Sequence, residues 1–159
     1  MKNKKFILTA IFGIWIAGIA NADTSRVGSA QDLGIGPMLG QPMGASAKYW
    51  FNSTVAADVG LGYHFDDNLA VHSDILWHSF SSFGLTNGRL PFYLGAGGRV
   101  LVGDDSQFGI RLPLGISFLP SADPLEFFFE LAPVVQLAPD LDADLDGVIG
   151  IRLYLNYIR

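Results

Sequence analysis

The chain has 159 residues, of which half are apolar and only 16% are charged. This length fits a single domain, and 19 Gly and 8 Pro argue against a bundle of long helices. The formal net charge of −5 excludes a nucleic-acid binder, which needs a basic surface, and the lack of cysteine excludes disulfides, thiolate metal sites and cysteine nucleophiles. The mean hydropathy of +0.33 is high for a soluble domain.

Residues 1–22 have the pattern of a cleavable secretory signal peptide. Three lysines in the first five residues precede an apolar run over Phe6–Ile19, and Ala20-Asn21-Ala22 supplies the small residues of a cleavage site. The apolar run would extend about 21 Å as a helix, which is short of the ~30 Å hydrocarbon core that an uncleaved membrane anchor must cross. We therefore expect export and a mature domain over residues 23–159.

The mature sequence alternates between apolar and small or polar residues in segments of about ten. In the clearest example, Val55, Val59 and Leu61 lie on one face, whereas Asp58 and His64 lie on the other. Turn residues separate the segments. The pattern predicts eight strands, at residues 33–39, 46–51, 55–65, 69–78, 90–102, 108–118, 125–137 and 148–157.

Two closed architectures fit this alternation. A soluble barrel of lipocalin type would turn its apolar face inward and carry apolar ligands, whereas a membrane barrel turns the apolar face toward lipid. The polar face has few charges and many glycines, which suits a narrow lumen better than a solvated surface. The sequence thus favours an all-β fold, an eight-stranded antiparallel up-and-down transmembrane β-barrel. Aromatic girdles are expected at the membrane interfaces, formed by Tyr49, Trp50, Tyr63, Phe65, Trp77, Phe118 and Tyr157.

At this level the chain resembles a known class of protein. The export signal, the eight alternating segments and the short turns are similar to the OmpA/OmpX-type small outer-membrane barrels. Residues 58–63 (DVGLGY), 90–99 (LPFYLGAGGR) and 125–134 (LEFFFELAPV) resemble an uncharacterised small-barrel family of spirochaetes. The resemblance implies a barrel in the bacterial outer membrane, in contact with lipid and monomeric, but it implies no particular activity.

Charged residues on the inward face predict a network that fills the lumen. Pairing the strands across their turns places Glu130 diagonal to both Arg111 and Arg152, and it places Arg99 opposite Arg111. A paired interior would plug the lumen, whereas a hydrated one would form a narrow ion-conducting channel. The expected lumen network consists of Asp58, Asp74, Arg99, Arg111, Glu126, Glu130 and Arg152.

Acidic connections gather at one end of the predicted barrel, because odd-numbered connections all lie at the same end. This rim carries Asp66, Asp67, Asp104, Asp105, Asp140, Asp142, Asp144 and Asp146. The stretch from Asp142 to Gly147 matches the first half of a calcium-binding loop, but Leu153 occupies the position of its bidentate glutamate. The rim is therefore either a divalent-cation site, with weak calcium binding at Asp140, Asp142, Asp144 and Asp146, or a solvated acidic hairpin.

Catalysis is not expected. A lipid-modifying barrel enzyme would need serine and histidine on one face, but His72-Ser73 and His78-Ser79 are adjacent pairs whose side chains alternate between faces. No catalytic residues, metal ligands or cofactors are assigned beyond the calcium alternative. The sequence favours a structural or adhesin-like role, with an external protein ligand at the acidic loops. A narrow ion-conducting channel is the alternative function.

Overall fold

The structure, a computed structural model, describes residues 32–65, 68–79, 84–85, 87–103 and 106–155. The expected signal peptide at residues 1–22 lies outside this range, as do Asp66, Asp67, Asp104, Asp105 and Tyr157. Within the described residues, no helix is long and apolar enough to cross a membrane. The strands are β1 (Leu33–Gln41), β2 (Met43–Trp50), β3 (Val55–Tyr63), β4 (Leu69–Ser79), β5 (Gly84–Leu85), β6 (Gly88–Arg89), β7 (Phe92–Val102), β8 (Gln107–Arg111), β9 (Leu114–Pro120), β10 (Leu125–Ala138) and β11 (Asp142–Tyr154).

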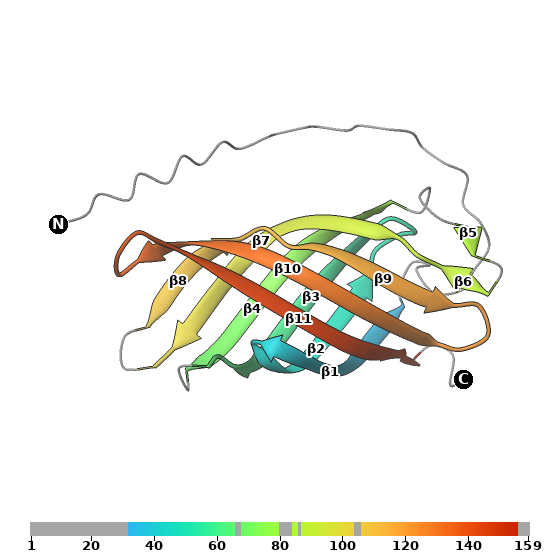
Figure 1. Cartoon of the computed structure of the whole chain (residues 1–159), viewed down its shortest axis with the longest axis horizontal. Coiled ribbons are helices and arrows are strands. Elements are labelled where there is room, and N and C mark those ends of the chain that lie inside the picture. Colours follow the sequence, from blue (N-terminus) through green and yellow to red (C-terminus); the bar gives the residue numbers. More distant parts are fainter. Residues whose placement is uncertain (1–31, 66–67, 80–83, 86, 104–105, 156–159) are drawn as a thin grey trace.

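The long strands pair in a closed antiparallel ring (Figure 1). β1 pairs with β2, β2 with β3, β3 with β4, and β4 with β7. β8 and β9 follow one another in the position between β7 and β10, and each pairs with both of these strands. β10 pairs with β11 over twelve residues, and β11 returns to β1, where Gly34 is opposite Tyr154 and Gln41 is opposite Gly147. The all-β, antiparallel prediction is confirmed.

Three elements differ from the predicted boundaries. The strand expected at residues 108–118 is divided at Leu112-Pro113 into β8 and β9, because proline has no N–H to donate to a ladder. The last strand begins at Asp142, not near residue 148, so the expected acidic connection at residues 139–147 is wrong for Asp142–Gly147. A short hairpin, β5–β6, was not predicted, and its second strand pairs with the end of β9.

The two faces of the ring have opposite chemistry. Outward residues are large and apolar but exposed, such as Leu39 at 56% and Leu114 at 55%, whereas inward residues include charged side chains that are fully buried, such as Arg111 at 0%. This division follows the two-residue period of a strand, which sends successive side chains to opposite sides. The predicted alternation therefore sets which side chains meet inside the ring.

Among the described residues, apolar side chains inside the ring form small clusters. Met38, Phe128 and Val148 form one of them, and Trp50 and Tyr154 belong to another. Trp50 is fully buried, so its expected place in an outer aromatic girdle is wrong. Its ring packs against His78 at 4.3 Å between centroids, and His78 in turn lies 5.1 Å from Tyr93. These three rings fill the interior toward the end where β2 ends.

Candidate functional site

All seven residues of the expected lumen network lie inside the ring and are buried. They come from β3, β4, β7, β8, β10 and β11, because each sits at an inward position of its strand. Ion pairs link them to one another, to Asp144 and Asp146 of the expected rim, and to Lys48, which the sequence analysis did not assign. The network divides into one cluster around Arg111 and a second around Arg152 and Glu126.

Arg111 is the centre of the first cluster. Its Nη2 donates to Glu130 Oε1 at 2.7 Å and its Nε donates to Asp146 Oδ2 at 3.2 Å, while Nη1 contacts Asp74. Glu130 also accepts a hydrogen bond from the Tyr93 hydroxyl at 2.8 Å. One guanidinium therefore joins three strands, β4, β10 and β11, to β8. The planar fork of arginine makes this possible, since it offers five N–H donors in fixed directions.

Arg152 joins the opposite walls of the ring in the second cluster. Its Nη2 pairs with Asp58 Oδ2 at 2.8 Å, and its Nη1 pairs with Glu126 Oε2 at 3.4 Å. Its Nε donates to Ser46 Oγ at 2.6 Å, and its guanidinium carbon lies 3.8 Å from the ring centroid of Phe128. Each nitrogen of this buried guanidinium thus has a partner, and Phe128 packs on it.

Glu126 receives the largest number of donors in the second cluster. Lys48 Nζ donates to its Oε1 at 2.7 Å, and the Ser117 hydroxyl donates to the same oxygen at 2.5 Å. The Tyr154 hydroxyl donates to Oε2 at 2.6 Å and accepts a hydrogen bond from Trp50 Nε1 at 2.9 Å. Lys48 and Arg152 together balance the charges of Asp58 and Glu126.

Two expected contacts are corrected by the register. Arg152 lies opposite Glu126 and pairs with it, rather than lying diagonal to Glu130. Arg99 lies opposite His72 and Gly109, not opposite Arg111. The two arginines nevertheless approach the same carboxylate, Asp146, because that acid lies between them. Its negative charge removes the repulsion that the expected register implied.

The mouth of the ring, formed by residues that follow β3 and begin β11, contains the outermost ion pairs. Arg99 Nη1 donates to Asp146 Oδ1 at 2.5 Å, and its Nη2 pairs with Asp144 Oδ2 at 2.8 Å. His64 Nε2 lies 3.5 Å from Asp144 Oδ2, and the His64 ring also contacts the side-chain amide of Gln41. Asp146 is fully buried, whereas the Asp144 side chain is 36% exposed.

The four rim aspartates do not act as one group. Asp140 and Asp142 are exposed, Asp144 is half-buried and Asp146 belongs to the interior cluster. Asp142, Asp144 and Asp146 lie on an extended strand, so their backbone positions follow one another at intervals of about 7 Å instead of winding around one point as in a calcium loop. Arg99 nevertheless draws the carboxylates of Asp144 and Asp146 together. The carboxylates of Asp142 and Asp144 each accept a local backbone N–H, from Ala143 and Leu145 respectively, at 2.8 Å.

The adjacent histidine and serine pairs point to opposite sides of the wall. His72 and His78 are buried inside the ring, whereas Ser73 and Ser79 are exposed on its outer face. Within each adjacent pair, the imidazole and the hydroxyl lie on opposite sides of the strand and do not meet.

Sequence reasoning missed several members of the network. Lys48 was not assigned because its strand alternates poorly, and Asp146 was read as part of a turn. The two-residue period of a strand could have identified them. Ser46, Lys48 and Trp50 share one face of β2, and Asp146 shares a face of β11 with Arg152. The same rule places the neutral partners inside, namely Tyr93, Ser117 and Tyr154.

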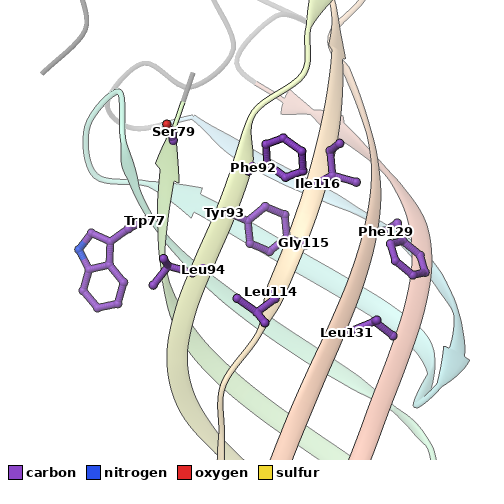
Figure 2. Close-up of a pocket in the computed structure, with 10 residues that line it drawn as sticks. All are labelled: Trp77, Ser79, Phe92, Tyr93, Leu94, Leu114, Gly115, Ile116, Phe129 and Leu131. Carbon is purple, nitrogen blue, oxygen red and sulfur yellow. The ribbon is translucent and has the colours of Figure 1, made fainter. Parts of the chain in front are cut away.

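Apolar grooves run along the outer wall. One of about 500 Å³ crosses β4, β7, β9 and β10 and is lined by Trp77, Leu94, Leu114 and Phe129 among others (Figure 2). The labelled side chains in Figure 2 are almost all hydrocarbon.

Comparison of the chain with protein-family models, curated proteins and solved structures found no match.

Proposed function

We propose that this chain is an integral outer-membrane β-barrel, eight-stranded and transmembrane, with a plugged lumen and a structural or surface-interaction role. The observation that carries the proposal is the reversed distribution of polarity. Four cations and five carboxylates are buried in the network, whereas large apolar side chains cover the outside. In water such an outer face would be an aggregation hazard, whereas in lipid it is the expected one.

Ring closure supports the same proposal. Every long strand has a hydrogen-bonded neighbour on both sides over much of its length. In a bilayer an open edge would leave backbone groups unsatisfied at several kcal/mol each, so closure is a condition for insertion. Strands of 9 to 14 residues, such as β3 and β10, are long enough to cross the apolar band when tilted. The expected signal peptide would direct the chain to the envelope.

The first test of the proposal is electrophoretic mobility. We expect the full chain, expressed and purified from membranes in detergent, to migrate differently in SDS gels before and after boiling. The reason is that a closed ring with a paired interior keeps its shape in SDS until heat separates the strands. A protein that remains in solution without detergent and gives one band under both conditions would contradict the proposal and favour a periplasmic carrier of apolar ligands.

The exposed end of the β10–β11 hairpin is the part of the described structure best suited to an external partner. Asp140 and Asp142 are exposed there, beside the half-buried Asp144. A partner with a basic surface would complement these charges. The barrel would then serve as a membrane anchor that presents a small acidic surface.

A narrow channel is the second candidate, because charged side chains extend from the half-exposed Asp144 to the buried Arg111. We expect planar bilayers containing the protein to show no stepwise conductance, since Arg111, Glu130 and Tyr93 occupy the cross-section with direct hydrogen bonds. Glu130→Gln is the matched variant. Conductance steps in the unaltered protein that change size in Glu130→Gln would establish the channel and overturn the plugged lumen.

A further inference from the structure

His64, Asp144 and Asp146 come together at the mouth of the ring although they are distant in sequence. One ring nitrogen and two carboxylate oxygens, one from each residue, all lie within 4.8 Å of one another. His64 and Asp146 are buried, and the Asp144 side chain is 36% exposed. Asp144 is therefore the member of this group that contacts solvent.

In this region the carboxylates outnumber the guanidinium groups that pair with them. The cluster around Arg111 continues through Asp146 to Arg99 at the mouth. Together, Arg99 and Arg111 pair with four carboxylates. Those carboxylates belong to Asp74, Glu130, Asp144 and Asp146. With all of them ionised, the cluster lacks two positive charges, whereas the cluster around Glu126 is balanced by Lys48 and Arg152. A divalent ion at the mouth would supply the two missing charges, as would two protons on the buried carboxylates.

We propose that His64, Asp144 and Asp146 bind a divalent transition metal ion of the zinc class. An imidazole nitrogen with carboxylate oxygens is a donor set that zinc accepts, whereas calcium takes six to eight oxygens. Three protein ligands leave one position of a tetrahedral site for water or for a group from an external partner. The site lies at the end of the ring, so it does not depend on whether the outer wall faces lipid.

A neighbouring side chain is arranged to support the carboxylate ligands. Arg99 donates to both carboxylates, at 2.5 Å to Asp146 and 2.8 Å to Asp144, and a carboxylate oxygen has a second lone pair for a metal. Metal-ligating carboxylates in proteins commonly have such an outer partner. The Gln41 amide contacts His64 Nε2, the ring nitrogen that faces Asp144, so this amide must turn away when a metal binds there.

The test is calorimetric titration of zinc chloride into the full chain purified from membranes in detergent. We expect one zinc site per chain, with affinity reduced at least about tenfold in His64→Ala and in Asp144→Asn, because each variant removes a ligand. Asp140→Asn is the matched control, since Asp140 is an exposed acid at the same end of the molecule, and its zinc affinity should be unchanged. Zinc affinity that is unchanged in His64→Ala would overturn the proposal.

Two further measurements keep the test decisive. Should His64→Ala fail to fold, cobalt(II) added to the unaltered protein should give visible absorption bands of a low-symmetry nitrogen and oxygen site, and zinc should remove them. Cobalt that remains spectrally like the aqueous ion would overturn the proposal.

Calcium is expected to bind more weakly than zinc. Calcium binding that is tighter than zinc and is lost in Asp140→Asn would instead assign the ion to the exposed acids, and would also overturn it.

Discussion

Replacing Arg111 with methionine is expected to lower the free energy of unfolding by about 3–5 kcal/mol, because it leaves three buried carboxylates without their common cation. Asp74, Glu130 and Asp146 all bind this one guanidinium. Methionine approximates the length of the side chain but returns no charge. Urea-induced unfolding from lipid vesicles, followed by tryptophan fluorescence, measures the difference.

The arginine prediction has an internal control. The double variant Arg111→Met with Glu130→Gln should lose less stability than the sum of the single variants, because one of the carboxylates without a cation is then neutral. Arg111→Lys should be intermediate, since a lysine keeps the charge but cannot reach three acids from one planar group. A loss below about 1 kcal/mol in Arg111→Met would mean that the acids are compensated in another way.

Replacing Gly36 with alanine is expected to disrupt the pairing that closes the ring. A Cβ at this position would lie 1.8 Å from the backbone oxygen of Ile151 and 2.8 Å from its carbonyl carbon. Because these are backbone atoms of the neighbouring strand β11, the strain cannot be relieved by rotating a side chain. We expect a loss of about 3 kcal/mol, at the upper end of the usual range for overpacking.

Gly98 supplies the matched control for this second prediction. It also lies within a strand, but a Cβ there would have its nearest neighbours, Gly109 O and Phe108 Cε2, at 3.7 Å. Gly98→Ala should therefore fold like the unaltered chain. The measurement is the fraction of unboiled protein that keeps the folded mobility in SDS gels after stepwise heating. Equal thermal resistance of the two variants would contradict the expected role of Gly36.

The direction of the side chains on the clearly alternating strands could be predicted from the sequence, because it depends only on counting by two along a strand. Arg111 and Ser117 illustrate this well. They remain on one face although Leu112-Pro113 separates β8 from β9, since the break adds no extra residue to the count. Asp58, Asp74 and Glu126 were placed inside for the same reason, whereas on the weakly alternating β2 the inward Trp50 was placed outside.

The partners of these side chains could not be predicted, because they depend on the register between strands. The sequence pairing assumed that Asp142–Gly147 belonged to a turn, since Asp and Gly favour turns. In the structure these residues continue β11, and Asp146 reaches Arg99 and Arg111. The composition of a segment is a weak guide when an arginine inside the ring can stabilise an acid on a strand.

The site at the mouth could not be predicted for a similar reason. His64 and Asp144 are 80 positions apart, and nothing in their local sequences indicates that they meet. Their 3.5 Å approach results from the closure of β11 onto β1, which brings the start of β11 near the end of β3. Only a structure that joins the first and last strands reveals it.

The unequal lengths of β11 and β1 have a consequence for how neighbouring copies of the chain behave. The last pair between these strands is Gln41 with Gly147, whereas β11 stays paired with β10 back to Asp142 opposite Gln136. The segment Asp142–Asp146 thus continues past β1, at the end of the hairpin on the left of Figure 1. A strand border of this kind is a template on which a second molecule could polymerise. The exposed carboxylate of Asp142 disfavours such growth, because a second copy added at this border would bring like charges together.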